Sequence, residues 1–560
     1  MELKTPSQDR FATHEVTNQP PPLAPYDAWL TDLPLQQSLM REGAGWALPE
    51  VEAYGPIAGG ELMELGFAAN ENKPVFKPYD RYGHRIDEVE FHPAYHRLME
   101  LGIAHGVPNF AWRHAETAGA HVARAALMYL HGQADQGTCC PLTMTYASVP
   151  VFQHAPALAE EWLPRITSID YDARSLPAWK KRGNTIGMGM TEKQGGSDVR
   201  ANTTRAHSLN AGGANRLFEL VGHKWFVSAP MCDAFLVLAQ AEHGISCFLV
   251  PRFAPHAGEL NEHNAIRIQR LKDKLGDWSN ASSEIEFEGT VGWLVGEEGR
   301  GVATILEMVA LTRQDCMIGS AALMRQALVQ AIHHARHRKA FGKLLSEQPL
   351  MQNVLADLAL ESEAALALTM RVARAVDAAP RDAGEAAFAR IATAIGKYWV
   401  CKRCAPFVNE AQECLGGAGY VEESILARLY RQAPLNSIWE GSGNIQCLDV
   451  LRALKREPAA RDALFAEFAT VANTNRWLDR HVARLAADLG NTESLELRAR
   501  TLVEAMAVGL QAVQLLRVED SRVGEQFCAA RLSEHMSRNF GTLQASAPFG
   551  ALIERALGSL

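Results

Sequence analysis

The chain has 560 residues and a mass of 61.4 kDa, which is too long for one hydrophobic core and predicts three or four domains. Its 47% apolar and 21% charged residues are typical of a soluble globular protein, and its net charge of −9 argues against binding nucleic acid with the whole surface. No run of 18 apolar residues occurs and residues 1–5 are polar, so we expect no membrane span, no secretory signal and a cytoplasmic location.

Residues 1–185 have the pattern of a proline-rich arm followed by a helical domain. Pro20, Pro21 and Pro22 favour an extended segment lying over a surface. From His114 to Leu130, alanines and apolar residues at helical spacing predict a helix.

Between residues 186 and 295 the hydrophobic period changes from helical to strand-like. Short β-rich runs at 217–221, 235–239, 246–250 and 284–287 are separated by Gly, Asn and Pro. Several strands in so short a segment predict a small barrel or sandwich domain. The order of helices, then strands, then helices predicts an α+β protein that is mostly α, rather than alternating βαβ units.

Long helices return in residues 296–450 and continue in residues 451–560. Apolar residues at three- and four-residue spacing over 302–337, 349–376 and 386–415 predict an antiparallel bundle. Residues 451–560 carry 13 Arg and one Lys against 13 Asp or Glu, so this segment is near +1 while the remainder is near −10.

The ten cysteines are scattered and mostly embedded in apolar patterns, which predicts reduced, buried thiols rather than a disulfide framework. Cys401 and Cys404 form the only CxxC in the sequence. Because no second pair or histidine set would complete a tetrahedral site, we predict no metal.

A single carboxylate stands in a loop that leads into a helix near residue 440. Glu440 follows Trp439 and precedes Gly441, and apolar residues resume at helical spacing from Ile445. Glycines let a backbone approach a flat ligand, and the free N–H groups at a helix start favour an anion. By itself, the pattern also fits a solvated turn that caps a helix.

Four other clusters contain residues suited to a flat, phosphate-bearing ligand. Residues 187–198 combine glycines with small hydroxyls, and residues 222–228 offer an indole and a hydroxyl. Residues 338–344 end a long helix in cations that suit a pyrophosphate, and residues 412–420 end another in glycines. Taken singly, each also fits a structural role: a linker, core aromatics, a cationic helix end or a glycine cap.

The clusters are more specific together than alone. In chain order they are Met-Thr-Glu…Gly-Ser-Asp, Lys-Trp-Phe-Val-Ser, Arg-x-x-Phe-Gly, Gln-x-x-x-Gly-Gly-x-Gly-Tyr and Ile-Trp-Glu-Gly-Ser. This order resembles the acyl-CoA dehydrogenase superfamily. Within it, MTEKQGGSDV, NSIWEGSGNI and the C-terminal helical extension are most similar to the flavoproteins of the bacterial adaptive response to DNA alkylation.

The resemblance covers nearly the whole chain and implies a fold, a cofactor and an assembly. The fold would be an N-terminal arm and helical domain (1–185), a middle β-domain (186–295), a C-terminal helical bundle (296–450) and an extra Arg-rich helical domain (451–560). The assembly would be a homotetramer, with FAD between the β-domain, the bundle and a neighbouring subunit.

The resemblance also implies site residues, with Glu440 as the catalytic base. The residues expected to bind the cofactor form three groups, of which the second would hold its adenine and pyrophosphate end, partly across a subunit interface. They are Met188, Met190, Thr191, Gly196, Ser197, Lys224, Trp225 and Ser228; then Arg338, Phe341, Gln412, Gly416 and Gly417; then Ile438, Trp439, Gly441, Ser442 and Asn444.

A base that removes a proton beside a thioester carbonyl needs a carboxylate within reach and a raised pKa. Burial against Trp439 and an acyl chain would raise the pKa of Glu440, whereas the helix start behind it would lower that pKa, and the residues leave the balance open. Trp439 stands where the family often has Tyr. The bulkier indole would narrow the acyl pocket, so we expect weak turnover.

The cations of residues 451–560 predict contact with DNA. Arg476, Arg480 and Arg484 recur at four-residue spacing on one helical face. Such a pattern suits phosphates and needs no base-reading motif, so binding to double-stranded DNA would be largely independent of sequence. Interleaved acidic residues also fit a salt-bridged surface. The residues predicted to bind DNA are Arg452, Lys455, Arg456 and Arg531.

The leading hypothesis is therefore an FAD-containing, DNA-binding protein of the alkylation response that protects DNA from alkylating agents or inactivates them, with a weak acyl-CoA dehydrogenase site. The alternative is a metabolic acyl-CoA dehydrogenase for short branched acyl-CoAs, whose extra domain serves assembly. A third is a DNA-coating module that uses FAD structurally.

Overall fold

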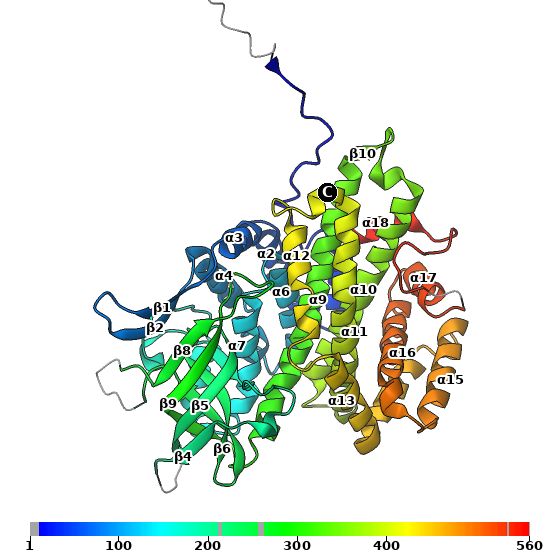
Figure 1. Ribbon diagram of the computed structural model, residues 1–560. Coiled ribbons are helices and arrows are strands. Elements are labelled where there is room, and N and C mark those ends of the chain that lie inside the picture. The colour runs from blue at the N-terminus through cyan, green and yellow to red at the C-terminus, as the bar shows by residue number, and fades with distance from the viewer. Residues whose placement is uncertain (1–10, 211–215, 256–261, 535–536, 559–560) are drawn as a thin grey trace, which may run out of the picture.

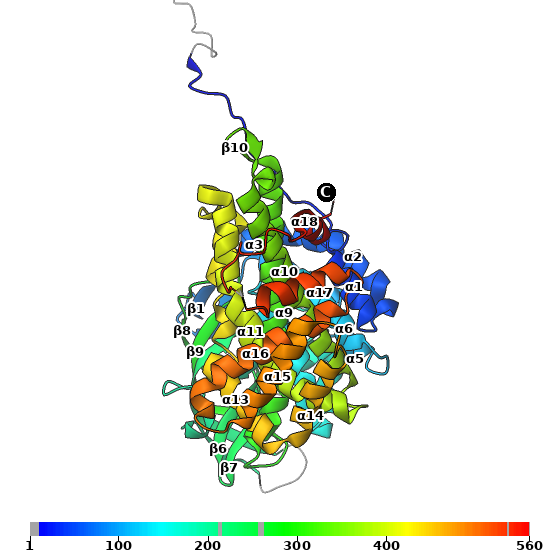
Figure 2. The same ribbon diagram turned by 90° about the vertical axis from the view of Figure 1, so that its right-hand side faces the viewer.

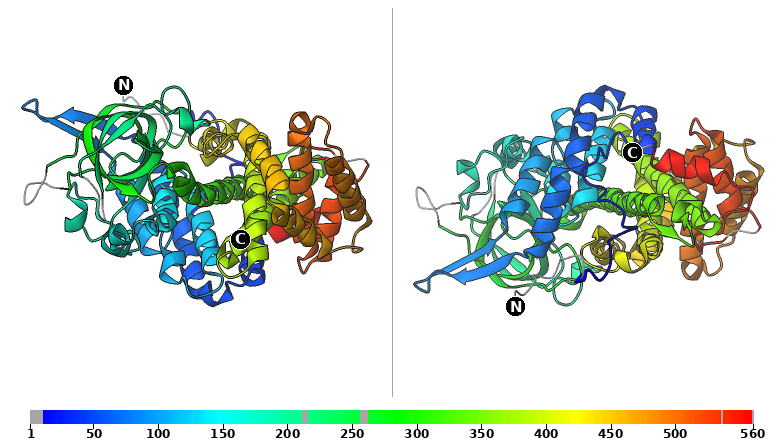
Figure 3. Two further views of the ribbon diagram at one scale, coloured as in Figure 1. Left: turned by 90° about the horizontal axis from the view of Figure 1, so that it is seen from below. Right: turned by 90° about the horizontal axis from the view of Figure 1, so that it is seen from above.

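The computed structural model describes residues 11–210, 216–255, 262–534 and 537–558, so the expectation about a secretory signal in residues 1–5 lies outside the described residues. Three long helices, α9 (Gly301–His337), α10 (Pro349–Ala378) and α11 (Ala383–Leu415), form the centre. The N-terminal helices and the β-domain lie on one side of them and the C-terminal helices on the other (Figures 1 and 3).

The N-terminal region is helical apart from one hairpin. Its helices are α1 (Leu33–Arg41), α2 (Leu48–Gly59), α3 (Glu61–Glu71), α4 (Pro93–Ala104), α5 (Phe110–Arg113), α6 (Ala120–Ala134), α7 (Cys139–Phe152) and α8 (Pro156–Ile166). The helix expected from His114 begins at Ala120, because Gly119 precedes it with φ +90°. Strands β1 (Val75–Tyr79) and β2 (Arg85–Glu90) form an antiparallel hairpin that the sequence patterns did not predict.

The middle region is a closed barrel, which confirms the strand-rich domain. Its strands are β3 (Ile186–Gly189), β4 (Arg205–Ser208), β5 (Leu217–Ser228), β6 (Ala234–Ala241), β7 (Gly244–Pro251), β8 (Ile266–Leu271) and β9 (Ser282–Val295). Neighbouring strands pair in the order β3-β6-β4-β5-β9-β7, and β7 pairs back with β6, which closes the ring. β3 runs parallel to β6.

The remaining elements follow the long helices. They are β10 (Lys339–Ala340), β11 (Lys343–Leu344), α12 (Ile425–Gln432), α13 (Gly443–Arg456), α14 (Pro458–Ala469), α15 (Arg476–Gly490), α16 (Leu495–Leu516), α17 (Ser521–Arg531) and α18 (Phe549–Ala556). α13 runs through residue 450, where the sequence patterns placed a domain boundary.

The C-terminal helices share the core of the bundle. α16 packs on α10 and α11, α14 packs on α11 and α18 packs on α10 (Figure 2). Buried apolar side chains run without interruption from the N-terminal helices through the barrel and bundle into α16 and α17. The fold class, α+β and mostly α, is therefore confirmed.

Three further predictions concern cysteines, membrane spans and metal sites. All ten cysteines are buried and free of disulfides, as expected for reduced thiols. Among the described helices, none is both long enough and apolar enough to cross a bilayer. In the same residues, no group of three or more His, Cys, Asp or Glu side chains is placed to hold a metal ion.

Candidate active site

Glu440 lies in the loop between a short turn of 3-10 helix, η7 (Leu435–Ser437), and α13. Its backbone adopts φ +56°, and Gly441 follows with φ +95°. A left-handed conformation costs a non-glycine residue on the order of 1–3 kcal/mol, so it persists only where the surroundings enforce it. Ser442 then serves as the N-cap residue of α13.

Three side chains from other segments hold the backbone of this loop. The buried Lys397 of α11 donates from Nζ to the carbonyl oxygens of Trp439 at 2.7 Å and Gly441 at 2.5 Å. Arg313 of α9 donates from Nε to the carbonyl of Glu440 at 3.0 Å, and Gln446 Nε2 donates to the same oxygen at 3.0 Å. The loop carbonyls are thus satisfied by positive or amide donors, which fixes the strained conformation.

The Glu440 carboxylate is held by a single side-chain hydrogen bond. Thr312 Oγ1 donates to Glu440 Oε2 at 2.7 Å. Burial raises the pKa of Glu440 above its ordinary value, and the Thr312 hydrogen bond and the charges of Lys397 and Arg313 lower it only in part. Burial therefore decides the direction of the pKa shift of Glu440, which the sequence left open. A raised pKa suits a base that works near neutral pH.

Ser228, at the end of β5, lies near Cys140 of α7. Burial raises the pKa of the Cys140 thiol to about 12; Ser228 hydrogen bonds to this thiol, and Glu440 is close enough to contribute to the rise. Ser228 also lies 3.1 Å from Ser282 between their Oγ atoms. Cys140 of α7 and Ser228 of β5 therefore lie together, and the charge of Glu440 acts on the thiol.

The indole of Trp439 is fixed next to the base. Its Nε1 donates to Asn436 Oδ1 at 2.9 Å, and the ring is partly buried against the core. Ile438 is exposed, and Asn444 accepts a hydrogen bond from Arg500 Nε at 2.9 Å. Asn444 is therefore bound to α16 of the C-terminal region in the isolated chain.

The loop after β3 is built around Thr191. Its carbonyl accepts a hydrogen bond from the Trp225 N–H at 2.8 Å, and a Cβ at Gly196 would lie 2.4 Å from Thr191 Oγ1, so only glycine fits there. Met188, Met190 and Thr191 are partly buried, and Ser197 is exposed in the same loop. This loop follows the strand that the resemblance assigns to the flavin.

Lys224 does not bind the cofactor, contrary to the prediction. Its side chain is 0% exposed and its Nζ donates to Glu192 Oε1 at 2.8 Å. Glu192 also accepts the N–H groups of Thr203 and Thr204, at 2.7 and 3.1 Å. The buried pair holds the loop in place from inside the barrel, a role that its position in the motif did not indicate.

Trp225 and Phe226, which follow Lys224, differ in how far their side chains are exposed. Trp225 is covered by Lys272, whose Nζ lies 3.4 Å from the ring centroid, while Phe226 is half exposed with the same Nζ 4.4 Å from its ring. Phe226 was missed at the sequence level, although it stands between two residues that were named. Its exposure makes it available to a flat ligand.

The adenine-end group lies at the opposite end of the bundle. Arg338 follows the end of α9 and donates to the carbonyl of Asn18 at 2.6 Å, and Gln412, near the end of α11, donates to the carbonyl of Gly419 at 3.0 Å. Phe341 is 100% exposed at φ +52°, and open space surrounds the positions where Gly416 and Gly417 would carry a Cβ.

The structure does not bring this group to Glu440 within one chain. Arg338 lies 26 residues beyond Thr312, the α9 residue that contacts Glu440, and a helix of that length rises about 39 Å. One dinucleotide cannot touch both ends. Figure 1 shows the β10 end of the bundle far from α13.

Three of the four residues predicted to bind DNA are exposed. Arg452, Lys455 and Arg456 lie at the end of α13, and no ion pair of theirs is found among the described residues. Arg531 is 3% exposed and donates to Asp357 at 2.5 Å and to Glu361 at 3.0 and 3.1 Å on α10. The prediction for Arg531 is wrong, because its charge is used inside the protein.

The α15 arginines form an exposed row with partial pairing. Arg480 Nη1 lies 2.7 Å from Glu534, and Arg484 Nε lies 3.9 Å from Asp488. Arg476 is exposed beside Trp477, with its guanidinium 4.5 Å from the ring centroid. Figure 2 shows α15 on the outer face of the C-terminal helices.

Three segments of the chain match models of known protein families. Residues 18–173 match the adaptive response protein AidB N-terminal domain, residues 187–290 the acyl-CoA dehydrogenase middle domain, and residues 299–455 the acyl-CoA dehydrogenase C-terminal domain. The putative acyl-CoA dehydrogenase AidB of Escherichia coli (strain K12) is 48% identical over 524 residues, which cover 93% of this chain and 95% of that protein. The chain belongs to the acyl-CoA dehydrogenase family, in its AidB group.

Solved structures of acyl-CoA dehydrogenase type agree with the fold. The apo form of Bd2924 superposes with a TM-score of 0.82 at 28% identity, covering 90% of this chain and 99% of that one. Caenorhabditis elegans ACDH-11 in complex with C11-CoA gives a TM-score of 0.82 at 24% identity, covering 94% and 95%. At that identity the second likeness shows the fold alone.

Members of the acyl-CoA dehydrogenase family are FAD-dependent, which confirms the predicted cofactor. The residues present fit it: Thr191, Ser228 and the exposed Phe226 belong to the barrel, and the carboxylate of Glu440 is buried in the loop before α13 of the bundle. The open space at Gly416 and Gly417 suits close approach of a phosphate-bearing group.

Proposed function

We propose that this flavoprotein removes a proton from an acyl-CoA thioester with Glu440 as the base. The observation that carries this proposal is the Glu440 carboxylate, held by Thr312 at 2.7 Å with a pKa raised by burial. The similarity of nearly the whole chain to relatives named as acyl-CoA dehydrogenases supports an acyl-CoA as the substrate. When bound, FAD supplies the acceptor for the hydride.

The residues around Glu440 would each have a defined task. Ionised Glu440 takes the proton, and Lys397 and Arg313 keep its backbone from relaxing out of the strained conformation. Thr312 stabilises the charged form before the proton moves. The fixed indole of Trp439 limits the room beside the base, so we expect slow turnover and a preference for short acyl groups.

The test is an anaerobic titration of the FAD-loaded protein with short branched acyl-CoAs. We expect the flavin absorbance to bleach in the wild type and in the exposed control Glu423→Gln, but not in Glu440→Gln. Bleaching that persists in Glu440→Gln would remove the assignment of the base. If no acyl-CoA bleached the flavin, the protein would be a flavoprotein without acyl-CoA dehydrogenase activity.

We further propose that two copies of the chain complete each FAD site, in a homotetramer. The support is the separation of the two groups along α9 together with the full exposure of Phe341.

We also propose that the protein binds double-stranded DNA, largely independently of sequence, and acts in the cytoplasm in the response to alkylation damage. The ends of α13 and the outer row of α15 supply exposed Arg and Lys side chains, and ten free thiols fit a reducing compartment. Similarity to AidB supports the role in the adaptive response.

Point substitutions test the DNA proposal better than truncation, because removing the C-terminal helices would uncover the apolar faces of α10 and α11. We expect Arg452→Ala to weaken duplex retardation, and the exposed Arg182→Ala, outside this region, to leave it unchanged. If the wild type and both variants bound duplex DNA with equal affinity, the result would favour the alternative. In that alternative the extension serves assembly and the protein is a metabolic enzyme.

A further inference from the structure

A second cavity lies away from the Glu440 site. It has a volume of about 290 Å³ and lies between the β1–β2 hairpin, α4, the segment around Tyr171 and the turn after β5. Small-molecule sites occupy about 300–1,000 Å³, so the cavity is large enough for a small organic ligand. None of the residues named above for FAD or for Glu440 lines it.

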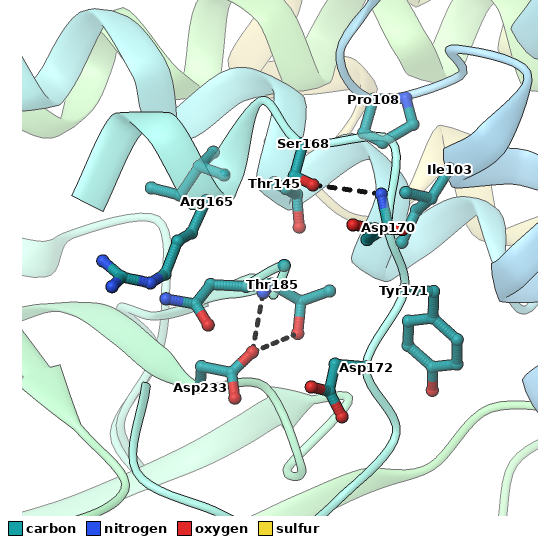
Figure 4. Close-up of a pocket in the computed structure, with 13 residues that line it drawn as sticks. Ile103, Pro108, Thr145, Arg165, Ser168, Asp170, Tyr171, Asp172, Thr185 and Asp233 are labelled. Carbon is teal, nitrogen blue, oxygen red and sulfur yellow. Dashed lines mark hydrogen bonds between the residues drawn. The ribbon is translucent and has the colours of Figure 1, made fainter. Parts of the chain in front are cut away.

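A much smaller hollow shares a wall with this cavity. Figure 4 shows Tyr171, Asp172 and Thr185, which line both, and the hydrogen bonds of Thr185 to Asp233. The hollow has a volume of about 10 Å³, room for roughly one water molecule. Of these two spaces, the larger is therefore the one that can hold an organic ligand.

The cavity is lined by a buried arginine without a carboxylate partner. Arg252 follows β7 and is 7% exposed. Its Nη1 lies 3.3 Å from both Ser175 Oγ and Met231 Sδ, and its Nε has no hydrogen-bond partner. Across residues 11–558, outside the undescribed gaps, no carboxylate oxygen forms an ion pair with this guanidinium. A buried, unpaired cation is costly, which indicates a missing anionic partner.

The other charges of the lining are already paired. Lys181 Nζ lies 2.6 Å from Asp233, Asp172 lies 2.6 Å from Arg174, and Lys77 pairs with Glu90. Of the carboxylates that line the cavity, Glu88 is the one with no ion pair among the described residues, and it stands on β2 beyond ion-pair distance of Arg252. Arg252 is thus the cation left for a ligand.

Part of the remaining wall is apolar, beside the polar side chains of His96, Ser175 and Thr185. Phe91 and Tyr95 stack with ring centroids 4.0 Å apart, and Val89, Met99 and Met231 extend the same surface. Apolar and aromatic side chains combined with a few placed polar groups are the usual composition of a small-ligand site. Methionines adapt their shape to a bound apolar group.

We propose that this cavity binds a small monocarboxylate with an apolar body. The carboxylate accepts hydrogen bonds from the guanidinium of Arg252, whose fork matches two carboxylate oxygens, and the apolar body lies against Phe91, Met99 and Met231. The site is separate from the proposed acyl-CoA chemistry and does not depend on it.

Calorimetric titration of the FAD-loaded protein with benzoate and hexanoate, and with benzamide and hexanamide as neutral matches, tests the proposal. We expect the acids to bind and the amides to bind at least about tenfold more weakly, because only the acids neutralise the guanidinium. Arg252→Met should abolish binding of the acids, and Arg252→Lys should weaken it, since an ammonium lacks the fork.

Two controls separate a binding role from a structural one. Arg182→Met removes a nearby exposed arginine that does not line the cavity and should leave binding unchanged, and Glu88→Gln should leave it unchanged or strengthen it. Without ligand, Arg252→Met should melt no lower than the wild type, because it removes an unpaired buried charge. Absence of acid binding in the wild type, equal binding of acids and amides, or unchanged binding in Arg252→Met would overturn the proposal.

Discussion

The backbone of Glu440 is strained and its carboxylate is buried, and different residues stabilise these two features. Lys397 and Arg313 satisfy the carbonyls of the loop, whereas Thr312 alone donates to the carboxylate. Because no arginine or lysine of the described residues donates to the carboxylate oxygens, burial prevails and the pKa stays raised. A base with a raised pKa and a fixed backbone is what proton abstraction requires.

The first prediction concerns pH. The proposed base must be ionised, so the rate of flavin reduction by acyl-CoA should rise with pH through the pKa of Glu440. Thr312→Val removes a hydrogen bond that favours the charged form, which raises that pKa and moves the rise to higher pH. Thr312→Ser keeps the hydroxyl and should retain the wild-type profile. A profile that does not move in Thr312→Val would contradict the role of this hydrogen bond.

The second prediction concerns Lys397 as a positioning residue. Lys397→Met removes the donor to the carbonyls on both sides of Glu440, and a misplaced base should reduce the rate of flavin reduction by about a hundredfold with little change in acyl-CoA affinity. Lys402→Met, an exposed position on the same helix, is the control. Partial recovery in Lys397→Arg would support positioning, whereas an equal loss of affinity and rate would argue against it.

At the scale of the element, β5 shows how one strand divides its roles. Lys224 points into the barrel and pairs with Glu192, Trp225 lies under Lys272, and Phe226 is open to the outside. A strand sends successive side chains to opposite faces, and the bulge between Lys224 and Val227 shifts that alternation. The motif identified the strand, but not which of its side chains can reach a ligand.

The third prediction concerns the helix pair α10 and α17. Burial raises the pKa of Glu361, but Arg403 and Arg531 outweigh it and lower that pKa to about 2. A carboxylate whose folded pKa is depressed stabilises the fold above its unfolded pKa of about 4.3 and loses this contribution as pH falls towards 2. Arg531→Met should therefore lower the free energy of unfolding at pH 7 by about 3–5 kcal/mol and reduce resistance to acid.

Urea denaturation followed by circular dichroism would measure this effect. Arg522→Met is the matched control, because Arg522 lies on the same helix and pairs with Asp520 at the surface, and it should change stability little. Unchanged stability in Arg531→Met would contradict the assignment of Arg531 to the core. It would also restore Arg531 as a candidate for DNA contact.

At the scale of the whole molecule, the length of α9 separates the two parts of the proposed FAD site. The fourth prediction is that Phe341→Ala lowers FAD retention and the mass of the assembly without lowering secondary-structure content, because Phe341 is fully exposed in its own chain. Size-exclusion chromatography with flavin absorbance would measure both quantities. Leu497→Ala, at an exposed apolar position on α16, should change neither.

The fifth prediction concerns the outer face of α15. Each arginine that neutralises a DNA phosphate contributes about 0.9 to the slope of log affinity against log salt, so replacing Arg476, Arg480 and Arg484 together by Ala should flatten the salt dependence of duplex binding. Affinities measured across a range of salt concentrations would show this. A slope equal to that of the wild type would place the DNA contacts elsewhere.

The sequence by itself determined the order of the parts and pointed to Glu440 as the proposed base. Strand-like and helical periods are local properties, so the barrel, the three long helices and the loop around Glu440 could be predicted from neighbouring residues alone. The family motifs predicted FAD as the cofactor. The β1–β2 hairpin escaped because β1 contains Pro78 and, of the two strands, only Val89 is buried, so the apolar signal of a strand is weak.

Only the tertiary structure decided which charges are free. Arg531 and Arg476 look alike in the sequence, yet one is buried against α10 and the other is exposed, because burial depends on helices that are distant along the chain. The same reason separates Lys224, enclosed with Glu192, from the site it was assigned to. The sign of the pKa shift of Glu440 and the unpaired Arg252 likewise arise from segments that meet only after folding.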